Sequence, residues 1–124
     1  MRMITISAGD VSLPAELNDG PTATQIWEAL PIRGKANHWG DEIYFEIPIT
    51  AAQEPSARAE VAVGELGYWP TGRAFCIFFG PTPVSSGDQP VAYSPVNILG
   101  KVIGDATAFR KVPDGAPVRL ERQA

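Results

Sequence analysis

Glycine and proline are spread along the whole chain, and their spacing limits what the chain can fold into. The 124 residues include 12 Gly and 12 Pro. They divide the sequence into short apolar segments that mostly alternate with polar residues, a pattern typical of an antiparallel β-barrel or β-sandwich. A chain of this length is expected to form one domain, residues 1–124, that folds without disulfides.

Composition and charge exclude several classes of partner. The single cysteine, Cys76, lies in an apolar run, which favours a reduced, buried thiol in a cytoplasmic protein. The net charge is -4, and the basic residues are scattered from Arg2 to Arg122, so we expect no nucleic-acid partner. No apolar run reaches the roughly 20 residues of a membrane helix, and no signal peptide is evident, so we expect no membrane association.

Strands are predicted at both ends of the chain. The segments "MRMITIS" and "DVSLPAEL" form a plausible first hairpin, and the alternating tail "PVRLERQA" predicts an edge strand that closes the sheet. The centre of the sheet is predicted to come from three segments, "IRGKANHWGDEIYFEIP", "GYWPTGRAFCIFFG" and "SPVNILGKVIG".

Two short helices are predicted between these strands. In "PTATQIWEALP", Thr22 and Gln25 fit a capping box, and Pro31 ends the helix. In "DATAFRK", Asp105 is the expected N-cap.

The Gly40-Asp41 pair predicts a tight hairpin that places Trp39 opposite Glu42. In this register Ile43 and Phe45 face the core. The opposite face is polar and aromatic, which indicates a binding surface, and it includes a predicted cross-strand ion pair between Lys35 and Glu46. The residues expected on this outer face are Lys35, Asn37, Trp39, Glu42, Tyr44 and Glu46.

A second hairpin is predicted around Pro70 and Thr71, with Gly72 in the left-handed conformation. This turn places Arg73 beside Trp69, where a cation-π contact would hold the guanidinium. The following run, 74–79, is apolar at every position and therefore needs cover on both faces. One cover is the interior, and the other is expected to be the long segment "GPTPVSSGDQPVAYSP".

Three motifs, "HWGDEIYFEIP", "GELGYWPTGRAFCIFFGPTP" and "SPVNILGKV", resemble the short prokaryotic cyclophilin-like proteins, a family of unknown function. The resemblance extends from about residue 3 to residue 120. It implies a mainly β fold, a closed eight-stranded cyclophilin-like barrel with two short helices, one at each end, and a substrate groove on the outside of the sheet. The Phe-His-Arg, Gln-Gly-Gly-Asp-Phe and late Trp motifs of the peptidyl-prolyl isomerases are absent, so the resemblance leaves catalysis undecided.

The expected function is binding of a small ring-bearing molecule or an extended peptide on the outer face. The alternative is a weak peptidyl-prolyl isomerase, or another enzyme, that uses the same groove with Arg73 as a donor or Glu42 as a general base. The aromatic residues could instead be packing residues beneath the long segment. The candidate ligand-binding residues are Trp39, Glu42, Tyr44, Tyr68, Trp69 and Arg73.

The other residues of reactive type are not expected to take part in a reaction. His38 falls on the core-facing register, and Cys76 is expected to be an inert core thiol. Asn97, polar within an apolar strand, either holds the backbone of a loop or contacts a ligand. One His, one Cys and dispersed carboxylates predict no metal site, and no phosphate or dinucleotide motif predicts a cofactor. The oligomeric state stays open, a homo-oligomer included.

Overall fold

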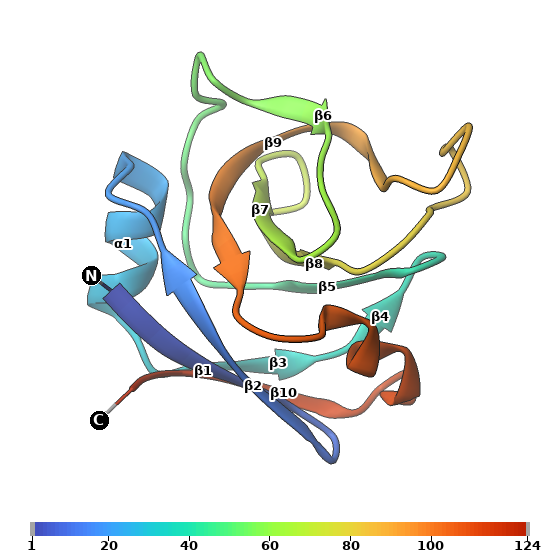
Figure 1. Ribbon diagram of the computed structural model, residues 1–124. Coiled ribbons are helices and arrows are strands. Elements are labelled where there is room, and N and C mark those ends of the chain that lie inside the picture. Colours follow the sequence, from blue (N-terminus) through green and yellow to red (C-terminus); the bar gives the residue numbers. More distant parts are fainter. Residues whose placement is uncertain (1, 124) are drawn as a thin grey trace.

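The computed structural model describes residues 2–123, which form ten strands, one α-helix and one 3₁₀ helix. The chain is mainly β, as predicted, and its strands curl around a common interior (Figure 1). The helices are α1 (Pro21–Ala29) and η1 (Ala106–Lys111). The strands are β1 (Arg2–Ala8), β2 (Val11–Leu17), β3 (Ile32–Lys35), β4 (Asn37–His38), β5 (Glu42–Glu46), β6 (Arg58–Glu60), β7 (Glu65–Trp69), β8 (Ala74–Phe78), β9 (Val91–Val102) and β10 (Pro117–Arg122).

The strands form one antiparallel sheet in the order β3-β10-β1-β2-β9-β7-β8-β5-β4, with β6 paired to β9 beside this path. The expected closed eight-stranded barrel is not confirmed, because the sheet has ten strands and its end strands β3 and β4 do not pair. Only Ala36 separates them, and its backbone bonds instead to Gly115 and Ala116. Phe45 packs on Gly34 at this join, where an added Cβ would lie 2.5 Å from the ring. The backbone at Ala36 and the packing of Phe45 on Gly34 therefore join the two ends of the sheet.

Most local predictions for the ends of the chain hold, with two corrections. β1 pairs with β2 as the predicted hairpin, but β10 is not an edge strand, because it lies between β1 and β3. Asp105 caps η1 by accepting from the Thr107 amide at 3.0 Å. The predicted capping box of α1 is wrong. Gly20 is the N-cap, and the Thr22 hydroxyl donates to Glu54 instead. In residues 2–123, no helix has the length and apolar character needed to cross a membrane.

Apolar side chains form two clusters, one inside the curled sheet and one on its outer side. Every residue of β8 is buried, so the prediction that this strand is covered on both faces is confirmed. The outer cover comes from the first half of β9, a long, curved strand (Figure 1). Val61 adds to this cover. Val84, in the middle of the long segment, is exposed and takes no part. The buried residues of the outer cluster are Val61, Ala74, Cys76, Phe78, Ala92 and Val96.

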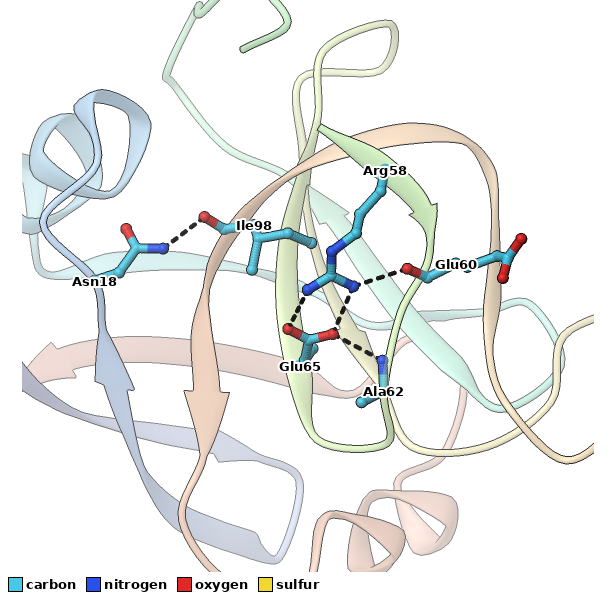
Figure 2. Close-up of polar contacts among 6 residues, drawn as sticks. All are labelled: Asn18, Arg58, Glu60, Ala62, Glu65 and Ile98. Atoms are coloured by element: carbon cyan, nitrogen blue, oxygen red, sulfur yellow. Dashed lines mark hydrogen bonds and ion pairs between the residues drawn. The ribbon is translucent and has the colours of Figure 1, made fainter. Parts of the chain in front are cut away.

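An ion pair holds β6 against the start of β7 (Figure 2). Arg58 donates to both carboxylate oxygens of Glu65, at 2.9 and 2.7 Å, and to the carbonyl of Glu60 at 2.8 Å. The same carboxylate accepts from the amide of Ala62 at 2.8 Å. Because Arg58 is half exposed, the pair adds little to the free energy of unfolding, and its main effect is to fix the position of the chain. It fixes the turn that brings Val61 onto the outer cluster.

Asn97 binds the backbone of the segment that connects β5 to β6 (residues 47–57), which we call the crossing segment. This confirms one of the two roles predicted for Asn97, that of holding the backbone of a loop. The side chain is fully buried. Its oxygen accepts from the amide of Glu54 at 2.8 Å, and its nitrogen donates to the carbonyl of Ala52 and to the hydroxyl of Thr22, each at 3.0 Å. One amide therefore ties β9, α1 and the crossing segment together.

We expect Asn97→Ala to lower the free energy of unfolding by about 1 to 3 kcal/mol, because it leaves buried backbone groups without partners. Chemical denaturation measures this loss. Asn37→Ala is the matched control, since its two bonds, to Lys35 and Tyr44, are exposed; it should cost less than about 0.5 kcal/mol. Equal losses in the two variants would contradict the role assigned to Asn97.

Candidate functional site

A cavity of about 120 Å³ opens on the outer face of the sheet. Its floor comes from β5 and β8, and its sides come from the turn before β5, from the end of β7 and from the first half of β9. We call it the aromatic pocket, because four rings line it. The lining residues are Trp39, Glu42, Tyr44, Trp69, Cys76, Ala92, Tyr93 and Val96.

The first hairpin supplies one side of the aromatic pocket in the predicted register. The amide of Trp39 donates to the carbonyl of Glu42 at 2.9 Å, and Gly40 has a φ of 59° that suits a tight turn. The turn is fixed from outside as well, because the amide of Asp41 donates to the carbonyl of Pro81 at 2.9 Å. Trp39 and Glu42 are thereby held at one rim of the pocket.

Trp69 forms the opposite side, and two contacts set its ring plane. The indole N–H donates to the hydroxyl of Ser94 at 2.6 Å. Gly72 lies against the ring so closely that an added Cβ would be 2.6 Å from two ring carbons. The indole donor is thus used inside the protein, and the ring presents its π-surface to the pocket.

Tyr93 joins the two tryptophans. Its ring lies edge-on to Trp39, with centroids 6.1 Å apart, and to Trp69, with centroids 5.9 Å apart. Such edge-to-face pairs are favourable. Yet Tyr93 is 73% exposed, so it forms the solvent-facing wall of the aromatic pocket.

Glu42 is the one carboxyl group that lines the aromatic pocket, and it is only 6% exposed. Burial raises its pKa to about 7, and a hydrogen bond with Cys76 partly offsets this rise. Among the five ion pairs that residues 2–123 form, none includes Glu42. The carboxyl group therefore exchanges its proton near neutral pH.

Cys76 is buried, as predicted. Burial, together with the nearby charge of Glu42, raises the pKa of the thiol well above its usual value. A thiol in this state supplies little thiolate and is a poor nucleophile. The ring of His38 likewise has a structural role, because its Nε2 forms a hydrogen bond with the carbonyl of Val112 at 2.5 Å.

The structure brings four of the six sequence-predicted site residues to the aromatic pocket, namely Trp39, Glu42, Tyr44 and Trp69. Tyr68 does not reach it. Its side chain points to the interior, and its hydroxyl donates to the carbonyl of Ile49 at 2.5 Å. The reason is strand alternation, since Tyr68 and Trp69 are neighbours and must face opposite sides.

Arg73 does not line the aromatic pocket either. The turn differs from the prediction, because Arg73 itself has the positive φ, 49°, and Trp69 pairs with Ala74. The guanidinium pairs with Glu46 at 2.6 Å. The predicted contacts between Arg73 and Trp69 and between Lys35 and Glu46 are thus replaced by a pair that joins the two hairpins.

Four lining residues were not among the predicted site residues: Cys76, which was expected to be an inert core thiol, and Ala92, Tyr93 and Val96. The last three lie on β9; Ala92 and Tyr93 fall in the segment expected to be a loop, whereas Val96 falls in a segment predicted to belong to the sheet. Prolines at positions 90 and 95 interrupt the alternation there, which hides the strand. An aromatic residue within a segment that must cover an apolar strand is the one signal that could have identified Tyr93.

We expect Glu42 to make stability pH-dependent. Between pH 4.5 and about 7 the unfolded chain releases this proton while the folded chain keeps it, so folding weakens as the pH rises. Relative to Glu42→Gln, the wild type should lose about 3 kcal/mol over this range and show no further change on either side. Denaturant melts at several pH values measure the difference, with the exposed Glu46→Gln as control. A flat difference would contradict the buried state of Glu42.

The comparisons with known proteins agree with this architecture. The solution structure of the hypothetical protein AF2241 from Archaeoglobus fulgidus is similar, with a TM-score of 0.84 and 35% sequence identity, covering 98% of this chain and 95% of that one. A structure of McbB in complex with tryptophan is similar in fold, with a TM-score of 0.73 and 17% identity, covering 98% of this chain and 45% of that one. A comparison with curated protein sequences finds no match.

The family comparison covers nearly the whole chain. The cyclophilin-like family profile matches residues 2–121. This range includes all three motifs on which the sequence-based resemblance rested and every residue that lines the aromatic pocket. The chain therefore belongs to the cyclophilin-like family.

Proposed function

We propose that this protein is a noncatalytic binding module whose aromatic pocket takes the ring of a small molecule, or of a side chain in an extended peptide. The observation that carries the proposal is the meeting of Trp39, Trp69 and Tyr93 around one cavity. Aromatic walls bind rings through stacking and edge-to-face contacts. A cavity of about 120 Å³ suits one ring better than a long ligand. McbB, which shares the fold, has been solved with tryptophan, a molecule of the proposed kind.

Fluorescence tests this proposal directly, because two of the three tryptophans line the aromatic pocket. In a Trp27→Phe variant, all tryptophan emission comes from Trp39 and Trp69. We expect proline-containing peptides to change this emission, and calorimetry to detect binding of tryptophan and indole, which fluoresce themselves, with affinities in the micromolar to millimolar range. Trp69→Ala should weaken binding about tenfold, because it removes one wall.

Trp27→Ala is the matched control. It removes an indole that packs outside the pocket, against Arg122 at 4.4 Å, and calorimetry should find ligand affinity unchanged. If no ring-bearing ligand binds, or if both alanine variants weaken binding equally, the proposed site is wrong.

A second candidate function is catalysis, and one observation favours it. The carboxyl of Glu42 has a pKa of about 7, which suits a group that exchanges protons with a substrate at neutral pH. Prolyl isomerisation is a weaker candidate. It needs a donor that weakens the amide resonance, and Arg73, the donor expected from the sequence, pairs with Glu46 outside the aromatic pocket.

We therefore expect weak or undetectable turnover of a proline tetrapeptide in a coupled isomerase assay. Arg73→Ala should leave both this background and ring binding unchanged. Robust turnover that Arg73→Ala abolishes would overturn the binding-module proposal and make Arg73 the catalytic donor.

A further inference from the structure

The buried carboxyl of Glu42 is the one polar feature of the aromatic pocket that its ring-binding walls do not explain. A buried carboxylate is costly unless a cation or hydrogen-bond donors compensate it. The other elements around the pocket offer it no cation: the titratable groups that line the cavity beside it are the phenols of Tyr44 and Tyr93 and the thiol of Cys76. In contrast, the carboxylates of Asp41 and Glu46, which are both more exposed than Glu42, are each paired with an arginine.

The walls favour the same type of partner. Indole and phenol rings attract cations over their faces, and Trp does so most strongly. The N–H of Trp69, a donor that could have served an anion or a carbonyl group, is bound to Ser94. No Lys or Arg is among the residues that line the cavity. The aromatic pocket thus offers π-surfaces and an acceptor, which suits a positively charged group and repels an anion.

We infer that the ligand is a ring-bearing amine in its protonated form, with its nitrogen paired to Glu42 and its ring against Trp39, Trp69 and Tyr93. This inference rests on the proposed binding function and names the chemical class of its ligand. A neutral ring would leave the carboxylate without a partner, and a carboxylate or phosphate on the buried end of the ligand would lie against a like charge.

Binding of such a cation is linked to ionisation of Glu42. A protonated Glu42 must release its proton to solvent before it can form the ion pair, so affinity falls as the pH drops below about 7. The fall approaches tenfold for each pH unit when the carboxyl is fully protonated in the free protein. A neutral ring shows no such dependence.

Three probes of similar size separate these cases: benzylamine, benzyl alcohol and benzoate. Titrations on the Trp27→Phe background at pH 8 and pH 5.5 measure each affinity, and benzylamine stays protonated at both. We expect benzylamine to bind about tenfold more tightly than benzyl alcohol at pH 8, with benzoate weakest. At pH 5.5 the preference for benzylamine should be largely lost. Calorimetry in two buffers should detect the proton released on binding near pH 6.5.

Glu42→Gln tests the residue itself. It should abolish the preference for benzylamine and its pH dependence, while benzyl alcohol binds within about twofold of wild type, because the ring walls are intact. Glu46→Gln, on the same strand but exposed and outside the cavity, should change neither affinity. If benzylamine and benzyl alcohol bind equally at both pH values, or if Glu42→Gln keeps the preference, the inference is wrong and ring binding stands. If none of the probes binds, the proposed function fails as well.

Discussion

The burial of β8 on both faces is the constraint on which the rest of this structure depends. A strand that is apolar on both faces cannot sit at a solvent-facing surface of the sheet, so the chain must return to cover it. β9 does so by bending: its first half lies over the outer face, and its second half continues the sheet. Gly67 permits this close approach, because an added Cβ would be 2.7 Å from Val96. The aromatic pocket opens beside this cover, over Cys76 of β8.

The carboxyl group of Glu42 is buried among these apolar side chains. Its neighbours across and along the strands are the residues of the outer cluster, Cys76 and Phe78 among them. Replacing Glu42 with an uncharged residue of similar shape would remove a desolvation cost, so folding alone gives no reason for a carboxyl group at this position. Its cost is understandable if the carboxyl acts on something that enters the pocket. In the proposed site, one side chain would thus couple structural burial to ligand chemistry.

Much of this arrangement follows from local rules that can be read from the sequence. Tight-turn chemistry at Gly40 set the register of the first hairpin, and that register placed Trp39, Glu42 and Tyr44 on one face. Alternation also places Tyr68 and Trp69 on opposite faces of β7, so that only one of the two can line the pocket. The conformation of the second turn was harder to predict. A glycine in a turn usually indicates a positive φ, but Gly72 is required because a side chain at this position would collide with the ring of Trp69, and Arg73 has the positive φ instead. The course of β9 depends on contacts distant in sequence, which no local pattern encodes.

The walls of the aromatic pocket differ in how firmly they are held, and this difference bears on selectivity. Trp69 is fixed by Ser94 and by the close contact with Gly72, and the Trp39 turn is tied to Pro81. Tyr93, in contrast, is largely exposed and is held mainly by edge contacts with the two indoles. Because most of its surface already faces solvent, a rotation of the Tyr93 ring would change its burial little. In the proposed binding module, we therefore expect the fixed tryptophans and Glu42 to set the chemistry of the site and Tyr93 to set the size of the ring that it can take.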